Sequence, residues 1–303
     1  MKRDFLDVTD FSAEEIHRVF RLAADLKRRQ KRGKAHRLLE GKTLAMIFQK
    51  PSTRTRVSFE TGMVQLGGHS LYISPADMGI GTRETVADVA RVLSRYNDAI
   101  MARVFAHDIL TGLAVHASVP VINGLSDRSH PCQILGDMLT VLEHRGSFQG
   151  LKVAWIGDGN NVAHSWIHMA MRIPMELDLA CPAGYEPDRT LVAEAQRLGT
   201  SRVRVVRNPL DAAADADVIY TDVWASMGQE KEAARRKKAF RGFRVDDRLV
   251  AMAKRNVLVM HCLPAHRGEE ITESVLEGPR SIVFDEAENR LHVQKAILVT
   301  LMR

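Results

Sequence analysis

The chain of 303 residues contains only three cysteines, an odd number without any C-x-x-C spacing. Cys132, Cys181 and Cys262 therefore suit neither a disulfide framework nor a structural zinc site, and a reducing cytoplasm is the expected location. Long hydrophobic runs are missing as well. No apolar stretch approaches the length that crosses a bilayer, and the first residues lack a secretory cleavage pattern. We expect no membrane partner.

Aromatic residues make up only 6% of the chain, and the excess of positive charge is only +6. The densest basic run, residues 27–37, closes a helix that we expect to begin at Ser12 with Glu15 as its capping-box partner. Cations are favoured at a helix C-terminus, and no aromatic residues interleave this run. We therefore expect no nucleic-acid partner. A nucleic-acid binder stays an alternative that a strongly salt-dependent affinity for oligonucleotides would reveal.

Signatures of two common enzyme classes are incomplete. Residues 157–162 begin like a dinucleotide-binding loop, but Val162 stands where the third glycine is needed. Ala180 and Cys181 occupy the place of the acidic residue that would bind the ribose. The sequence G-x-S-x-G is absent, and Ser165 falls within an expected helix. A nicotinamide-dependent dehydrogenase and a serine hydrolase are both disfavoured.

A run of hydroxyl and cationic residues, 52–56, lies between an expected strand and an expected helix. Apolar residues recur at helical spacing after it, at Val57, Phe59, Met63, Val64 and Leu66. Free amides, the positive end of the helix dipole and the hydroxyls of Ser52, Thr53 and Thr55 favour an anion at this turn. Arg54 adds a full charge and a fork of donors. Because successive helical residues turn by about 100°, Arg56 points elsewhere and is assigned to structure. A basic helix start with two solvated arginines is the alternative interpretation.

Strands and helices alternate along the chain in two rounds. The first round has expected strands over residues 43–48, 70–73, 99–102 and 119–122, and the second over 152–156, 176–180, 203–206, 218–221 and 257–260. This alternation predicts an α/β fold with two domains, each a parallel sheet covered by helices. We place the boundary near Gly146 and Gly150, giving domains 1–147 and 148–303. A last helix over residues 286–301 could pack back on the N-terminal domain.

Six expected strand ends carry polar side chains that are unsuited to a core. They are the turn at Ser52, Arg103, His130 with Gln133, Asn160 with Asn161, Asp222, and His261 with Cys262. Parallel sheets bind ligands at the carboxyl ends of their strands, so these residues could converge on one cleft if the two sheets face each other. Taken singly, His130 is more often a structural histidine and Cys262 a small core residue.

Several motifs in this order and spacing resemble the ornithine branch of the aspartate/ornithine carbamoyltransferase family over essentially the whole chain. They are residues 52–56 (STRTR), 130–133 (HPCQ), 157–161 (GDGNN), 222–228 (DVWASMG), 261–264 (HCLP) and 286–290 (EAENR). The first two occur across carbamoyltransferases generally. The DVWASMG and HCLP segments favour ornithine over aspartate as the acceptor.

The resemblance implies transfer of the carbamoyl group of carbamoyl phosphate to the δ-amine of L-ornithine, giving L-citrulline and phosphate in arginine metabolism. It implies neither a metal nor an organic cofactor. Carbamoyl phosphate would be bound by Ser52, Thr53, Arg54, Thr55, Arg103, His130, Gln133, Cys262, Leu263 and Arg290. L-ornithine would be bound by Asn161, Asp222, Ser226 and Met227. The catalytic residues would be Arg54, Arg103, His130 and Cys262.

The attacking δ-amine must first lose a proton. With a lysine-like pKa, deprotonation at pH 7 costs about 4 to 5 kcal/mol. A carboxylate against this amine would raise its pKa further, so we assign Asp222 to the α-amino group. Cys262 or the released phosphate is then the expected proton acceptor.

The resemblance also implies a homotrimer, or a multiple of trimers, in which a neighbour's loop helps to bind the phosphate. That loop corresponds to residues 76–82, and Gly79 stands where many members carry a polar side chain. Two alternatives stay open. One is a carbamoyltransferase with another amine acceptor, such as putrescine or N-acetylornithine, and the other is a non-catalytic relative that binds the anion and serves as an assembly partner.

Overall fold

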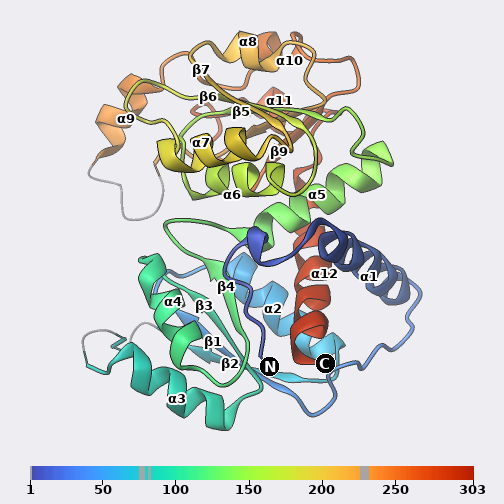
Figure 1. Cartoon of the computed structure of the whole chain (residues 1–303). Helices are drawn as coiled ribbons and strands as arrows, with labels where there is room; N and C mark the ends of the chain where they lie inside the picture. The colour runs from blue at the N-terminus through green and yellow to red at the C-terminus, as the bar shows by residue number, and fades with distance from the viewer. Residues whose placement is uncertain (1, 75–78, 81–82, 226–231) are drawn as a thin grey trace. The chain divides into compact units, whose positions relative to one another are not determined.

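The computed structural model describes residues 2–74, 79–80, 83–225 and 232–303 (Figure 1). The chain forms two compact units, Met1–Gly136 with Glu288–Arg303, and Asp137–Ala287. The division falls inside two continuous helices, α5 (Pro131–Arg145) and α12 (Val283–Met302). Gly146 and Gly150, the glycines of the expected boundary, take positive φ angles of 78° and 62° after α5 has ended. The domain limits 1–147 and 148–303 stay a prediction.

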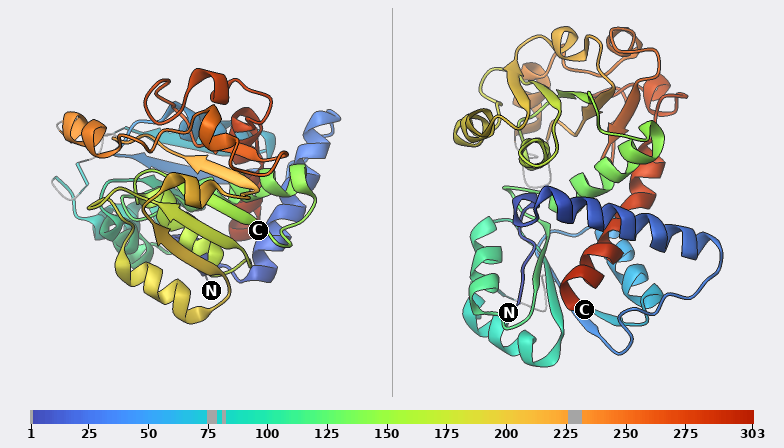
Figure 2. Two further views of the ribbon diagram at one scale, coloured as in Figure 1. Left: turned by 90° about the horizontal axis from the view of Figure 1, so that it is seen from above. Right: turned by 45° about the vertical axis from the view of Figure 1, so that its right-hand side comes forward.

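The first unit contains a four-stranded parallel sheet in the order β2-β1-β3-β4. Its elements are η1 (Val8–Asp10), α1 (Ala13–Lys31), β1 (Thr43–Phe48), α2 (Thr53–Gln65), β2 (His69–Ile73), α3 (Val86–Tyr96), β3 (Ala99–Arg103), α4 (His107–His116) and β4 (Val121–Leu125). Helices α3 and α4 cover one face of the sheet, while α2 and α12 lie on the other (Figures 1 and 2). Side chains alternate across a strand, so Ala45 and Ile47 of β1 pack toward Val89 of α3 and Leu110 of α4.

The second unit contains a five-stranded parallel sheet in the order β7-β6-β5-β8-β9. Its elements are β5 (Lys152–Ile156), α6 (Asn161–Ala170), β6 (Glu176–Ala180), α7 (Arg189–Leu198), β7 (Arg202–Val206), α8 (Pro209–Ala213), β8 (Val218–Thr221), α9 (Ala233–Ala239), α10 (Asp247–Val250), β9 (Leu258–His261) and α11 (Glu273–Leu276). Helices α6 and α7 cover one face, and α8, α10 and α11 cover the other (Figure 1). The fold class predicted from the sequence is confirmed.

The end of α12 packs on the first unit, as expected for the last helix. Residues 288–303 belong to that unit. Lys27 of α1 donates a 2.8 Å hydrogen bond to Asn289, and Lys295 donates one of 2.7 Å to Gln65 of α2. Within the part of the chain that the structure describes, none of the helices combines the length and apolar character that a bilayer crossing requires.

Individual elements differ from their predicted limits where tertiary contacts intervene. The strand expected over residues 119–122 is β4, which starts at Val121 and runs through Asn123 and Gly124 to Leu125. The Asn123 amide donates to the Leu6 carbonyl at 2.9 Å and to Ser129 Oγ at 3.2 Å, so a residue typical of turns is satisfied within a strand. Val57 and Val64 of α2 are exposed, although their spacing suggested a buried face.

Candidate active site

The turn before α2 is organised by its N-terminal cap. Ser52 has an extended backbone, and its Oγ accepts the Thr55 amide at 3.3 Å. The same Oγ donates to Thr55 Oγ1 at 3.2 Å. Thr53 is exposed at the first position of the helix. The other amides of the first helical turn have no acceptor within the helix. An anion bound at this turn would accept their hydrogen bonds.

Thr55 is the meeting point of two guanidinium groups. Arg290 of α12 donates to Thr55 Oγ1 at 2.9 Å, and Arg103 at the end of β3 donates to the same atom at 3.4 Å. All three side chains are buried. Gly136 of α5 allows this arrangement, because a Cβ on it would lie 3.2 Å from Arg290 Cγ. Two cations are thus held beside the helix start by contacts between distant parts of the first unit.

His130 precedes α5 and adds a neutral imidazole to this group. Burial, followed by the charges of Arg290, Arg103 and Arg54, holds its pKa well below the usual value of 6.5. The imidazole is therefore uncharged at neutral pH and has one N–H to donate. Gln133, in the first turn of α5, is buried in the same unit.

Arg54 and Arg56, two residues apart, have different surroundings. Arg56 pairs with Glu60 at 2.9 Å, and its guanidinium lies 3.9 Å from the centre of the Tyr72 ring. Arg54 is half-buried, and no hydrogen bond or ion pair joins it to another residue in the described part of the chain. Its charge nevertheless acts on His130. A half-buried cation that lacks a carboxylate partner is suited to an anionic ligand.

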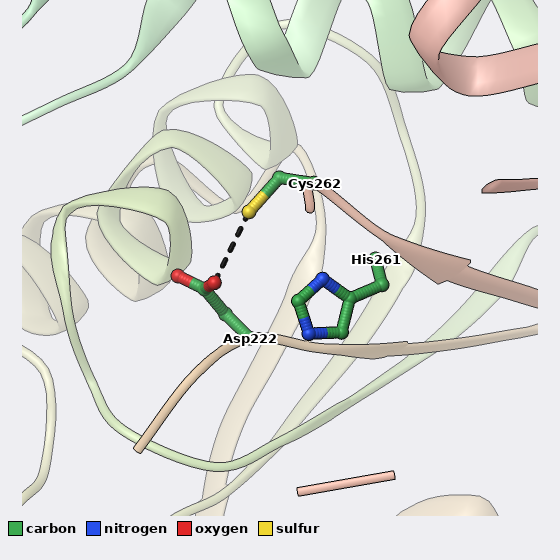
Figure 3. A group of neighbouring side chains, drawn as sticks. All are labelled: Asp222, His261 and Cys262. Carbon is green, nitrogen blue, oxygen red and sulfur yellow. Dashed lines mark hydrogen bonds between the residues drawn. The ribbon is translucent and has the colours of Figure 1, made fainter. Parts of the chain in front are cut away.

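The second unit brings Asp222 and Cys262 together beyond the ends of β8 and β9 (Figure 3). Cys262 Sγ donates to Asp222 Oδ1 at 3.1 Å, and Asn160 donates to Asp222 Oδ2 at 2.7 Å. Burial, followed by the neighbouring Asp222 carboxylate, raises the pKa of the Cys262 thiol well above 9. Cys262 is therefore a protonated thiol that donates to the Asp222 carboxylate.

Asn160 and Asn161 lie where β5 leads into α6. The side-chain Oδ1 of Asn160 accepts the amides of Val162 and Ala163, at 2.9 and 3.2 Å, and so caps the helix. Gly159 before it is required by space, because a Cβ there would lie 2.1 Å from the backbone nitrogen of Pro187. Gly159 thus serves close packing, and the loop presents Asn160 to Asp222.

The turn that carries Cys262 and Leu263 is held by the imidazole of His261. Leu263, with φ of 56°, donates its amide to His261 Nδ1 at 2.9 Å. Since Nδ1 is the acceptor, the ring proton lies on Nε2 and points to Glu270 Oε1, 3.2 Å away. His261 and Glu270 are both fully buried.

Asp222, His261 and Cys262 could each offer one ligand atom to a metal ion (Figure 3). These three atoms lie within 4.8 Å of one another. The donors are already engaged. Both nitrogens of His261 take part in hydrogen bonds, and Cys262 holds its proton. Metal ligands must be deprotonated and free to coordinate. We interpret this group as a hydrogen-bonded network.

The structure thus assembles two groups of the expected residues, each within its own unit. Ser52, Thr55, Arg103 and Arg290 are connected by hydrogen bonds in the first unit, with His130 under the influence of its cations. Asp222 and Cys262 are in contact in the second. Ser226 and Met227 lie outside the described residues, as does most of the loop 76–82, of which Gly79 is described.

Sequence reasoning overlooked two supporting groups. Asn160 was noted at a strand end but not as a partner of Asp222, and Glu270 was not considered. The polar doublet Asn160–Asn161 at the strand end is a signal that could have suggested the first contact. No sequence pattern indicates the contact of Glu270 with His261.

Comparisons with known proteins agree over the whole chain. The family model "Aspartate/ornithine carbamoyltransferase, carbamoyl-P binding domain" matches residues 3–143, and the model "Aspartate/ornithine carbamoyltransferase, Asp/Orn binding domain" matches residues 149–301. The ornithine carbamoyltransferase of Geobacter sulfurreducens is 55% identical over 303 residues, which is 100% of both chains.

Solved structures give the same result. The ornithine carbamoyltransferase of Pyrococcus furiosus is similar with a TM-score of 0.96 and 55% identity, covering 99% of this chain and 97% of that one. The enzyme of Thermus thermophilus gives a TM-score of 0.91 and 44% identity over the full length of both chains. By sequence and by structure, the chain belongs to the aspartate/ornithine carbamoyltransferase family.

Proposed function

We propose that this protein transfers the carbamoyl group of carbamoyl phosphate to the δ-amine of L-ornithine, forming L-citrulline and phosphate. The observation that carries the proposal is the cationic group around Thr55, in which Arg290 and Arg103 are fixed and Arg54 has no carboxylate partner among the described residues. Full-length identity of 55% to an ornithine carbamoyltransferase supports ornithine as the acceptor.

The phosphate of carbamoyl phosphate binds at the start of α2. The first-turn amides, with that of Thr55 among them, and the hydroxyls of Ser52 and Thr53 donate hydrogen bonds to its oxygens, while Arg54 and Arg290 offset its charge. Gln133 lies in the same unit and contributes to this site. Leu263 and Cys262 border the carbamoyl group from the second unit.

The reaction develops a negative charge on the carbamoyl oxygen as the amine attacks. Arg103, the neutral His130 and the Thr55 hydroxyl are donors fixed before the reaction starts, which is the condition for strong stabilisation of such an oxyanion. The C–N bond to ornithine forms, the C–O bond to phosphate breaks, and the phosphate leaves with the bonding electron pair. Carbamoyl phosphate is already activated, so we expect no metal or organic cofactor.

Ornithine is bound by the second unit. The Asp222 carboxylate, which accepts hydrogen bonds from Asn160 and Cys262, attracts the α-amino group, and Asn161, Ser226 and Met227 complete the site. Because its pKa is raised, the Cys262 thiol keeps its proton at neutral pH and cannot accept another. Of the two acceptors expected from the sequence, the departing phosphate is therefore favoured, and Cys262 serves as a hydrogen-bond donor to Asp222.

The finer features of the family are part of the same proposal. We infer a cytoplasmic enzyme of arginine metabolism that acts as a homotrimer or a multiple of trimers, in which the neighbour's loop 76–82 reaches the phosphate. Sedimentation of the purified protein tests the assembly, since a monomer at all concentrations contradicts it.

The activity is tested by a colorimetric assay of the purified protein with carbamoyl phosphate and one acceptor at a time. The acceptors are L-ornithine, L-aspartate, putrescine and N-acetylornithine. We expect a carbamoylated product with L-ornithine only. Turnover with a different acceptor alone would reassign the specificity. If none of the acceptors is carbamoylated, the protein is instead a non-catalytic relative that binds the anion.

A further inference from the structure

Glu286 lies in the first turn of α12 and has no role in the reaction described above. Its side chain is only 1% exposed. Both carboxyl oxygens are engaged: Tyr220 donates its hydroxyl to Oε1 at 3.0 Å, and the backbone amide of His261 donates to Oε2 at 3.0 Å. One carboxyl group thus joins the strands β8 and β9.

The partner on β8 is rigidly held. The Tyr220 ring stacks on Trp155 with centroids 5.3 Å apart, and Trp166 meets it edge-on at 5.5 Å. All three side chains are fully buried. Because aromatic packing fixes the ring, the hydroxyl is a stationary anchor for the carboxyl group.

The partner on β9 is the last paired residue of an edge strand. The ladder between β8 and β9 ends at the pair Thr221 and His261, and β9 has no other strand neighbour in its sheet. Glu286 therefore accepts the amide at the point where pairing stops. Cys262 and Leu263 follow directly, and the Cys262 thiol reaches Asp222 one residue beyond the ladder.

A buried carboxyl group is costly unless its environment compensates for the lost water. Burial raises the pKa of Glu286, and a hydrogen bond from the side chain of Asp137 acts in the opposite direction. Asp137, on α5, is itself fully buried. The hydrogen bonds from Tyr220 and from the His261 amide compensate for part of the lost water.

We propose that Glu286 is a positioning residue that fixes the turn of Cys262 and Leu263 against the anchor of Tyr220, so that Cys262 stays in contact with Asp222 in the ornithine site. The inference rests on the proposed function. It assigns a task to the motif at residues 286–290 that differs from the phosphate contact of Arg290.

Three substitutions test the inference. Glu286→Gln keeps the length and one oxygen that accepts the His261 amide, so its kcat should stay close to that of the unaltered enzyme. Glu286→Asp keeps the charge but is one methylene too short to reach both partners, and Glu286→Ala reaches neither. Since a misplacement of about 1 Å can cost about 10²-fold in rate, kcat should fall by about that factor in both.

The specific readout is the rate at which iodoacetamide alkylates Cys262. A loosened turn should expose the thiol, so alkylation should be faster in Glu286→Asp and Glu286→Ala than in Glu286→Gln, with an unchanged dissociation constant for inorganic phosphate. Asp285→Asn is the matched control, because this neighbouring carboxylate pairs with His144 at 2.9 Å on the surface. It should change neither kcat nor alkylation.

The inference is overturned if Glu286→Asp keeps normal kcat, or if it loses kcat while Cys262 is alkylated at the normal rate. Failure of both shortened variants to fold, with Glu286→Gln folding normally, also overturns it by assigning Glu286 to folding. A failure of the proposed function is distinguishable, because the unaltered protein would then form no citrulline while the alkylation comparison still reports on the turn.

Discussion

Arg290 donates a 2.9 Å hydrogen bond to Thr55 Oγ1 although 235 positions separate the two residues in the chain. Thr55 belongs to the first turn of α2, and Arg290 lies on α12. Helix α12 therefore supplies a cation to the turn at the start of α2. The proposed anion site thus combines residues that lie far apart in the chain.

Replacing Arg54 with Gln should sharply weaken the binding of carbamoyl phosphate. A hydrogen bond to a charged group is worth about 1.5 to 3 kcal/mol, so the dissociation constant should rise by at least tenfold. Calorimetric titration with carbamoyl phosphate measures it. Arg56→Gln is the control, because it removes only a surface pair with Glu60. Equal binding by the two variants would contradict the assignment of Arg54.

Replacing Thr55 with Val should reduce kcat without unfolding the protein. The change removes a hydroxyl that accepts from two guanidinium groups and is placed to donate to the oxyanion. Loss of one oxyanion donor typically costs about 10² to 10³ in kcat. Steady-state kinetics give the factor, and Ser58→Ala, on the same helix, should leave it unchanged. A Thr55→Val enzyme of normal kcat would remove Thr55 from the mechanism.

Asp222→Asn should weaken ornithine binding and spare carbamoyl phosphate. The amide keeps the size of the side chain but loses the charge that attracts the α-amino group. The expected result is a rise in the KM for ornithine, with an unchanged dissociation constant for carbamoyl phosphate as the internal control. If both affinities fell by the same factor, the assignment of one substrate to each domain would be wrong.

Lys295 makes the stability of the first unit depend on pH. Burial lowers its pKa from 10.5 to about 8, although it donates to Gln65. Between pH 8 and 10.5 the unfolded chain binds more protons than the folded chain. The free energy of unfolding should therefore rise with pH over this interval and decrease as the pH falls toward 8. At 1.36 kcal/mol per pKa unit, the effect is on the order of 3 kcal/mol.

The measurement is the thermal midpoint at several pH values between 7 and 10.5. The unaltered protein should gain stability over this interval relative to Lys295→Met, in which the titrating group is gone. Parallel curves for the two proteins would show that Lys295 does not titrate there.

Local sequence patterns predicted much of the fold. β1, β5, β6 and β8 have the predicted limits, because continuous apolar runs are properties of neighbouring residues. The capping box of Ser12 and Glu15 is present for the same reason, although α1 ends at Lys31 and leaves the rest of the basic run outside the helix. The family predicted from the ordered motifs is confirmed by the comparisons.

Contacts between distant residues could not be predicted in this way. The predicted strand stops at residue 122, whereas Asn123 belongs to β4 because it pairs with Ala102 of β3. Its side chain donates to Leu6 and Ser129. Spacing also does not indicate that Cys262 donates to Asp222, a contact that changes the expected chemistry of the thiol. Such pairs form because two strand ends are adjacent in the sheet, and no local sequence pattern predicts the order of the strands.

The sequence by itself thus determined the two parallel sheets, the capped turn at residues 52–56 and the family, because these depend on periodicity, caps and motif order within short segments. Tertiary structure alone decided which side chains meet. Arg290 reaches Thr55 because α12 packs on the first unit, and Glu286 joins Tyr220 to His261 because a helix start lies beside two strand ends. The physical reason is that burial fixes partners and protonation states, and burial is a property of the folded chain.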